Sequence, residues 1–261
     1  MGWLSLLPAG AVRILRRVLL KQGRRMGSAA MLARSKSSAL RACMDAARHS
    51  PAYRALLQEH GIDPSSIGPQ THLASLPVLT KANTFERFPL AQLARPLPAA
   101  MLADVLTSSG RGGRSYGFRL TAREQYEEAW FDSDLGLQDI FGVDDKPTLL
   151  VNCLPMGVVF RSRAVAVANV SVREDMACSI LRDVGPGFAQ TLLCTDPMFI
   201  RRLLDEAQAV GVDWRALGTS VILGEEVLVE TQRDYIAARM GIAIDHDPQR
   251  LVGSSFGVGE L

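Results

Sequence analysis

Short apolar runs alternate with helix-length segments in the second half of the chain, and this alternation constrains the fold most strongly. The runs Thr148–Leu154, Gln190–Leu193 and Ser220–Leu223 are typical of buried strands. Helical patterns fill Asp196–Val210 and Glu230–Met240. Strands separated by helices of about ten to fifteen residues form crossover units. The pattern therefore predicts an α/β fold with a mainly parallel sheet flanked by helices.

The ends of these segments carry recognisable signals. Asp196 can cap the start of a helix, and Gly241 can end one. A capping-box pattern predicts a helix over Thr121–Leu137, with Thr121 as its cap. Arg163–Val172 fits either a strand or a helix. Ile242–Ile244 is predicted to be the final strand.

The first hundred residues are predicted to be mostly helical. One helix is expected over about 37–49, before Pro51, and another over about 52–60, closed by Gly61. We therefore divide the chain into three predicted parts. These are a basic helical head (1–36), a helical N-terminal subregion (37–100) and an α/β region (101–261).

Basic residues are concentrated at the start of the chain. The eleven Lys and Arg residues up to Arg54 are opposed only by Asp45. In Ala11–Arg25, apolar residues recur at helical spacing, with Arg and Lys on the other side. Such a helix could lie on an anionic membrane surface, or it could pack on its own domain with a solvated basic face. The net charge of the whole chain is only +2, so we expect no nucleic-acid partner.

Composition and targeting features favour the cytoplasm. No apolar run reaches the roughly 18 residues needed to cross a bilayer, and no basic segment precedes the apolar start as in a signal peptide. The four cysteines include no Cys-x-x-Cys pair, which argues against a zinc site and a disulfide framework. We predict a cytoplasmic protein, peripheral at the inner membrane face if the basic head binds there. His246, between Asp245 and Asp247, fits a metal-binding loop less well than a solvated polar turn.

A glycine-rich loop follows the short predicted strand Val105–Thr107. It consists of Thr107, Ser108, Ser109, Gly110, Arg111, Gly112, Gly113 and Arg114. Its glycines allow a left-handed backbone that points successive amides at an anion. Its hydroxyls can donate to phosphate oxygens, and its arginines add charge and forked donors. The loop suits a nucleotide's phosphates, although it lacks the Gly-Lys-Ser/Thr ending of a Walker loop and a flexible surface loop would look similar.

Two acidic segments that contain glycine follow later in the chain. Gly224–Glu226 comes directly after the predicted strand Ser220–Leu223. In open parallel sheets, ligands gather beyond the carboxyl ends of the strands, so this turn is well placed for binding. Phe256–Glu260 puts a carboxylate on a glycine-containing loop, where Glu260 could hold Mg²⁺. Taken singly, Glu226 and Glu260 fit plain surface acids better than ligands.

The order of these three segments resembles that of adenylate-forming ligases. Thr107–Ser115 is similar to the family's phosphate loop, usually Ser-Ser-Gly-Thr-Thr-Gly-Lys-Pro. Gly224–Glu226 is similar to its Gly-Gly-Glu turn, and Phe256–Glu260 to its Tyr-Gly-x-Thr-Glu motif. Upstream, Ser50–Arg54 and Leu76–Lys81 resemble the opening of phenylacetate–coenzyme A ligases specifically.

This resemblance covers roughly residues 40–261 and implies a two-step reaction. A carboxylic acid attacks the α-phosphate of ATP in line and releases pyrophosphate, and a thiol such as coenzyme A then takes the acyl group. The protein positions the groups and neutralises charge. The resemblance implies that Thr107–Arg114 cradle the phosphates and that Glu260 holds Mg²⁺. It implies an adenylate pocket lined by Gly224, Glu225, Glu226, Phe256 and Gly257.

Several positions depart from the family's pattern. Arg111 and Gly112 replace two threonines, and Gly259 replaces another. Arg114 stands where lysine is usual, and the two are not interchangeable at a close phosphate contact. The sequence ends one residue after Glu260, before the family's ribose-binding aspartate, its hinge and the C-terminal lid with its catalytic lysine. No catalytic residue is therefore assigned.

Two hypotheses follow from the resemblance and the departures. The first is an incomplete N-terminal domain of an adenylate-forming enzyme, with 101–261 as its nucleotide-binding region and a lid polypeptide or a second copy as partner. The second is a catalytically inactive relative that acts as a ligand-binding or interaction module. The acid pocket is expected around Asn152–Phe160, which contains no distinctive selector apart from Phe160. The sequence therefore does not identify the acid.

Overall fold

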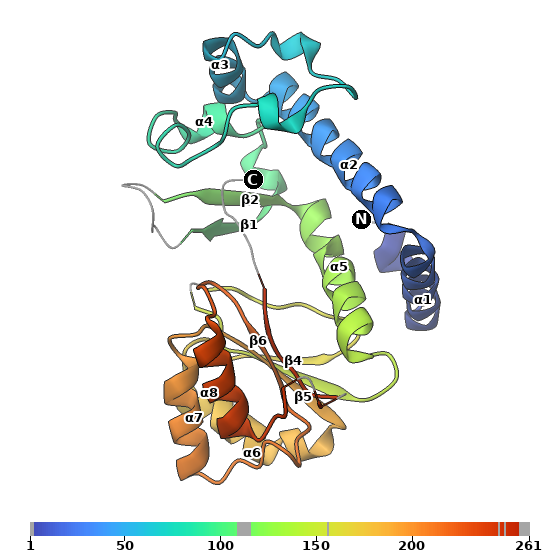
Figure 1. The fold of residues 1–261 in the computed structure, drawn as a ribbon, viewed down its shortest axis with the longest axis vertical. Helices are drawn as coiled ribbons and strands as arrows, with labels where there is room; N and C mark the ends of the chain where they lie inside the picture. Colours follow the sequence, from blue (N-terminus) through green and yellow to red (C-terminus); the bar gives the residue numbers. More distant parts are fainter. Residues whose placement is uncertain (1–2, 109–115, 156, 245, 248, 256–261) are drawn as a thin grey trace. The chain divides into compact units, whose positions relative to one another are not determined.

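The computed structural model describes residues 3–108, 116–155, 157–244, 246–247 and 249–255. These residues form two compact units (Figure 1). The first unit combines the chain up to Arg16 with the chain from Glu124 onward. The second unit comprises Arg17–Arg123.

A five-stranded sheet, in the order β4-β3-β5-β6-β7, forms the centre of the first unit. Every pair of neighbouring strands in it is parallel. Its strands are β3 (Thr148–Asn152), β4 (Ala166–Asn169), β5 (Gln190–Thr195), β6 (Ser220–Leu223) and β7 (Val252–Ser254). The prediction of an α/β fold with a mainly parallel sheet flanked by helices is confirmed.

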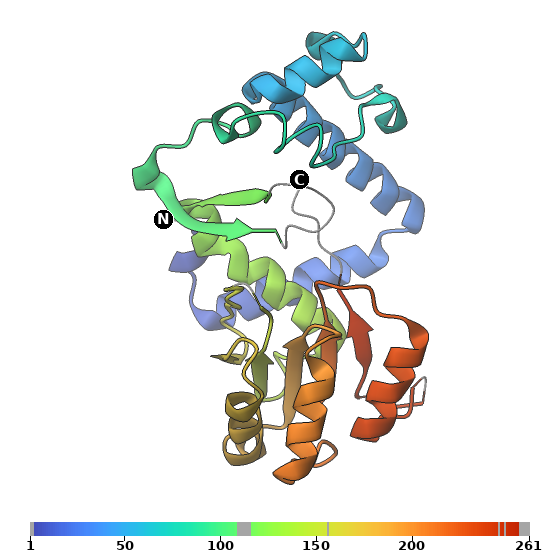
Figure 2. The same ribbon diagram turned by 90° about the vertical axis from the view of Figure 1, so that its left-hand side faces the viewer.

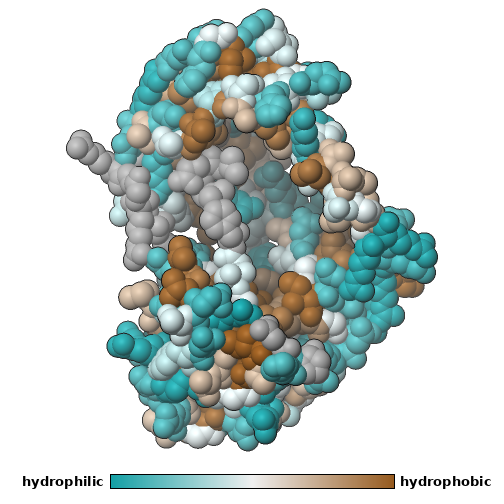
Figure 3. Space-filling model, viewed as in Figure 1, coloured by the Kyte–Doolittle hydropathy of each residue, from teal (hydrophilic) through white to brown (hydrophobic). Residues whose placement is uncertain are grey.

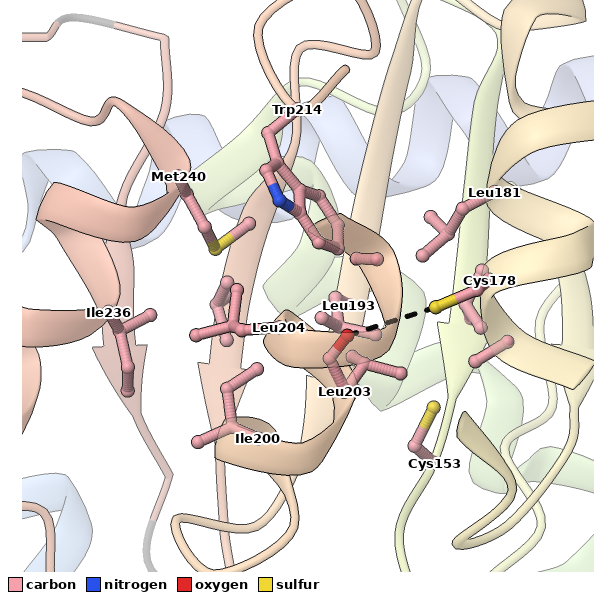
Figure 4. Close-up of a cluster of buried hydrophobic side chains, with 14 of the residues drawn as sticks. Cys153, Cys178, Leu181, Leu193, Ile200, Leu203, Leu204, Trp214, Ile236 and Met240 are labelled. Atoms are coloured by element: carbon pink, nitrogen blue, oxygen red, sulfur yellow. Dashed lines mark hydrogen bonds between the residues drawn. The ribbon is translucent and has the colours of Figure 1, made fainter. Parts of the chain in front are cut away.

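Helices cover both faces of this sheet (Figure 2). They are α5 (Arg123–Phe141), α6 (Glu174–Asp183), α7 (Ile200–Ala209) and α8 (Glu230–Met240). On one face, α6, α7 and α8 pack on Val151, Leu193 and Val221, and Figure 4 shows this core around Leu203. On the other face, α5 packs on Leu150 and Leu192. Neighbouring residues of each strand thus pack in the cores on opposite faces of the sheet, because side chains point alternately to the two faces.

Several predicted boundaries differ from the structure. The strand expected over Ile242–Ile244 is wrong: Ile242 packs into the core, but the chain then turns, with His246 and Asp247 donating to the Ala243 carbonyl. The last described strand is β7 instead. Thr121 does not cap α5, because it lies in strand β2 (Phe118–Ala122) and is buried there. The ambiguous stretch 163–172 contains strand β4.

The second unit combines helices and connecting turns with one β-hairpin. Its helices are α2 (Ser28–His49), α3 (Pro51–Glu59) and α4 (Leu90–Leu93), and α1 (Ala9–Arg25) leads into it from the first unit. The hairpin pairs β1 (Leu102–Thr107) with β2 (Phe118–Ala122) in antiparallel fashion. Single 3₁₀ turns occur in the second unit at Pro64–Ser66, Leu73–Ser75 and Ala99–Met101, and in the first unit at Trp3–Leu6 and Gly185–Gly187. The prediction of a mostly helical N-terminal region is confirmed.

The start of α1 is fixed to α5 in the first unit. Val12 is buried in a cluster with Trp130 and Phe131. Arg16 is 3% exposed and forms ion pairs with Asp134, at 3.4 Å, and with Asp144. A buried guanidinium needs such partners, because leaving a charge unpaired away from water costs several kcal/mol. Arg16 therefore does not belong to a solvated basic face.

Candidate functional site

The carboxyl ends of the parallel strands meet at one edge of the five-stranded sheet. Backbone hydrogen bonds continue past the strand ends and hold the following residues in place. The Cys153 amide donates to the Cys194 carbonyl at 2.8 Å, and the Gly224 amide donates to the Thr195 carbonyl at 2.9 Å. The Ser255 amide donates to the Leu223 carbonyl at 2.7 Å. This edge is where open α/β sheets bind ligands.

The Gly224–Glu226 turn sits at this edge, directly after β6. Gly224 is buried, and a Cβ atom added to it would lie 3.0 Å from the Ser255 hydroxyl. Glu225 has a φ of 70°, in the left-handed region that non-glycine residues seldom occupy. The Glu226 amide donates back to the Gly224 carbonyl at 2.9 Å. A strained, tightly packed turn of this kind is typical of a binding site.

Acidic side chains give this edge a distinct electrostatic character. Asp196 is 7% exposed and follows β5, and its carboxylate accepts from the amides of Met198 and Phe199 at 2.8 and 2.9 Å. Glu225 is exposed overall, yet partial burial, followed by the charges of Asp196 and Glu226, raises the pKa of its carboxyl. Within the described residues, no group of three or more His, Cys, Asp or Glu could hold a metal ion.

Two asparagines organise the loop that follows β3. They stand opposite each other in the register of β3 and β4, and Asn152 Nδ2 donates to Asn169 Oδ1 at 2.8 Å. Asn152 also donates to the Val158 carbonyl at 2.7 Å, and Asn169 accepts from the Phe160 amide at 2.9 Å. These hydrogen bonds hold both ends of the segment Asn152–Phe160, which is expected to shape an acid pocket. Sequence reasoning missed this pair, whose signal is an asparagine at the carboxyl end of each strand.

The glycine-rich loop begins and ends on the β1–β2 hairpin of the second unit. The Ser108 amide donates to the Gly117 carbonyl at 2.9 Å, and the Gly117 amide donates to the Ser108 hydroxyl, also at 2.9 Å. A Cβ on Gly117 would lie 3.1 Å from the Phe85 ring. The structure therefore places Thr107 and Ser108 at the end of β1, paired with Phe118 and Gly117 of the opposite strand.

Other predicted site residues lie outside the described part of the chain. They are Ser109, Gly110, Arg111, Gly112, Gly113 and Arg114 of the loop, together with Phe256, Gly257 and Glu260. Of the predicted residues, the structure places Gly224, Glu225 and Glu226 together in the first unit and Thr107 and Ser108 together in the second. Asp196 and the Asn152–Asn169 pair join the first group.

The buried thiols near this edge are poor nucleophiles. Burial raises the pKa of Cys153 and of Cys194 to about 12, and that of Cys178 to about 11. The thiolate is the reactive form of cysteine, so these side chains stay protonated and inert at neutral pH. The arrangement therefore offers carboxylates, amides and backbone groups for binding, rather than a cysteine for covalent catalysis.

A cavity of about 490 Å³ lies at the opposite, amino edge of the sheet. Lys146, Arg215 and Arg250 line it, and each stands just before one of the strands β3, β6 and β7 or in the turn leading to it. The Arg250 guanidinium donates to the carbonyls of Met240 and Gly241 at the end of α8. Because helix C-termini attract cations, this capping role accounts for Arg250. Asp247 forms an ion pair with Arg250 at 2.7 Å, so its carboxylate is neutralised by a residue three positions along the chain.

Comparisons with known proteins agree with the fold. No protein-family model matches the chain, and no curated protein matches its sequence. A crystal structure of an open conformation of 2-hydroxyisobutyryl-CoA ligase in complex with 2-HIB-AMP and CoA is similar, with a TM-score of 0.64 and 17% identity. A structure of this ligase with the same ligands in the thioesterification state has a TM-score of 0.61 and 18% identity.

The similarity covers most of this chain but only part of the solved enzymes. The open structure matches over 90% of this chain and 55% of its own length, and the second over 83% and 48%. At such low identity the likeness establishes the fold alone. The chain has part of the adenylate-forming ligase fold. It spans about half the length of these ligases.

Proposed function

We propose that this chain supplies the N-terminal, substrate-binding part of an adenylate-forming acid–thiol ligase. The observation that carries the proposal is the strained Gly224–Glu226 turn at the carboxyl edge of a sheet with this fold. Its supports are the order of the three sequence motifs and a fold similar to that of a CoA ligase solved with 2-HIB-AMP and CoA. The substrates are a carboxylic acid, ATP and a thiol such as coenzyme A.

Each part of the proposed site has a physical role. In the first step, a carboxylate oxygen attacks the α-phosphorus in line, and the bond to pyrophosphate breaks. Ser108 and the loop that follows it bind the phosphates with amides, hydroxyls and two arginines. Gly224 lets the backbone approach the adenylate, and the pinned loop after Asn152 bounds the acyl group. In the second step, the thiol displaces AMP from the acyl carbon.

Magnesium would accompany the nucleotide. Mg²⁺ commonly binds through one or two carboxylates together with phosphates and water, so Glu260 is a sufficient protein ligand. When bound, the ion neutralises charge on the phosphates. The partner that completes the enzyme would be a lid polypeptide or a second copy of the chain. Assignment to the phenylacetate–coenzyme A ligase kind rests on the upstream motifs alone.

A direct test is nucleotide binding by the chain as it stands, measured by titration calorimetry with ATP and Mg²⁺. We expect Arg114→Ala to weaken ATP binding by at least tenfold, since it removes a charged, forked donor. Arg119→Ala, at an exposed position of β2, is the matched control and should bind normally. Failure of the unmodified chain to bind ATP at millimolar concentration would refute the nucleotide role.

The second candidate is a catalytically inactive relative, favoured by the loss of two loop threonines at Arg111 and Gly112. The two candidates differ in pyrophosphate release. The ligase should release pyrophosphate from ATP with at least one acid of an aryl and alkyl panel, once a lid domain from a similar ligase is added. If no acid led to pyrophosphate release and the chain still bound ATP, the inactive module would be the correct candidate.

A further inference from the structure

The outer face of α1 combines exposed aliphatic and basic side chains. Ile14 is 66% exposed and Val18 is 44% exposed. Residues four and three apart share one side of a helix, so Lys21 and Arg25 extend the same stripe toward the end of α1. These four residues, Ile14, Val18, Lys21 and Arg25, are called the α1 stripe below. Because they lie on one continuous helix, the stripe exists however the two units are arranged.

The inner face of α1 is already occupied. Val12 is 2% exposed among aromatic side chains, and Arg16 is held by Asp134 and Asp144. Rotating the helix about its axis to bury Ile14 would break these ion pairs and leave buried charges without partners, which is strongly unfavourable. The helix is therefore fixed in an orientation that keeps the stripe outward.

The charge around the stripe is one-sided. α1 has six Lys and Arg residues among its 17 and no acidic residue; two of the six, Arg13 and Arg16, pair with aspartates of the first unit, and neither belongs to the stripe. Figure 3 shows hydrophilic side chains gathered over α1, on the right of the molecule. Exposed apolar side chains also stand at both ends of the helix: Leu6 before it is 69% exposed, and Met31 and Leu32 in α2 are 51% and 71% exposed. An exposed apolar strip that continues into Lys21 and Arg25 complements a membrane surface, where anionic headgroups lie above the acyl chains.

We propose that the α1 stripe binds the surface of a membrane rich in anionic lipids, with α1 lying in the plane of the interface. Ile14 and Val18 enter the boundary of the acyl chains, while Lys21 and Arg25 contact lipid phosphates. A nucleic acid would use the cations but leave the aliphatic side chains unmatched. Among the described residues, no helix is long and apolar enough to span a membrane. This inference is independent of the proposed ligase activity.

The test is cosedimentation of the full chain with vesicles. We expect binding to vesicles of phosphatidylcholine with about one-third phosphatidylglycerol, and at least tenfold weaker binding to phosphatidylcholine alone. The double variants Ile14→Ser with Val18→Ser, and Lys21→Glu with Arg25→Glu, should each reduce binding at least tenfold. Raising the salt to about 0.5 M should release the protein, because salt screens exposed charges.

Matched controls separate the stripe from general surface properties. Ile140→Ser replaces an equally exposed helical isoleucine, at 62%, and Arg201→Glu with Arg215→Glu reverses two exposed charges elsewhere. Both controls should bind vesicles as the unmodified chain does, and all variants should keep its thermal melt. Equal binding to neutral vesicles, full binding by the stripe variants, or preference for RNA over vesicles would overturn the proposal. So would a dimer that the stripe variants dissociate in the absence of lipid.

Discussion

The five-stranded sheet and the β1–β2 hairpin both carry predicted site residues, but they are supported in different ways. β3 and β5 are buried along their entire lengths between layers of helices. In the hairpin, only Thr121 of β2 is buried. A two-stranded hairpin is at best marginally stable alone in water, whereas a covered sheet is held by its core. The Gly224 turn is therefore preorganised by packing, whereas Ser108, at the end of β1, is held by local hydrogen bonds to Gly117.

The largest expected effect comes from the core of the sheet. Leu203 of α7 is fully buried against the sheet, so Leu203→Ala should lower the free energy of unfolding by about 2–5 kcal/mol. Val105→Ala in the hairpin, where Val105 is 50% exposed, should change it by about 0.5 kcal/mol or less. Urea unfolding followed by far-UV circular dichroism measures both, since the helices and strands of both units contribute to that signal. Equal costs at the two positions would abolish the distinction between sheet and hairpin.

The turn after β5 should show an intermediate effect. Asp196→Ala removes an acceptor for the amides of Met198 and Phe199 and should cost about 0.5–2 kcal/mol in urea unfolding. Asp196→Asn keeps an acceptor oxygen and should cost less than half as much. If both variants were equally unstable, the negative charge of Asp196, rather than its hydrogen bonds, would hold the turn.

The sequence was most informative where local signals and burial agree. β6 and α8 have the predicted bounds, because an apolar run marks Ser220–Leu223 and Gly241 ends α8 in a left-handed conformation. The Gly224–Glu226 turn was predicted for the same reason. These are the elements whose identity depends on neighbouring residues in the chain.

Features set by contacts between distant segments were missed. The Asn152–Asn169 pair depends on the register of β3 and β4, so an asparagine at the end of each strand becomes a signal only once that register is known. β7 is short and contains Gly253, so its composition alone does not predict a strand. It forms a strand because it pairs with β6. In the sequence Arg16 is one of many basic residues, and only the fold brings Asp134 and Asp144 to it.

The end of β1 should show a smaller, local effect. Ser108→Ala removes the hydroxyl that accepts from the Gly117 amide, a bond of about 1 kcal/mol. Hydrogen exchange at the Gly117 amide should accelerate about fivefold, while exchange in β5 should stay unchanged. Thr107→Ala, at an exposed neighbouring position, is the control and should leave Gly117 protected. Faster exchange across the whole sheet would mean that the hairpin and the sheet open together.

The smallest effect concerns the pH dependence of the sheet edge. Burial and the charges of Asp196 and Glu226 raise the pKa of Glu225 above its ordinary value of 4.5. The folded state then binds a proton more tightly than the unfolded state, so this contribution is fully present below pH 4.5 and is lost as pH rises through the folded pKa. Glu225→Gln should therefore gain stability relative to the unmodified chain between about pH 4 and 7. The gain should be about 0.5 kcal/mol or less, because solvent screens an exposed carboxylate.

Glu127→Gln, on the exposed side of α5, is the matched control for thermal melts across this range. A relative loss of stability with rising pH would mean that a cation or a hydrogen-bond donor, rather than neighbouring acids, dominates the surroundings of Glu225.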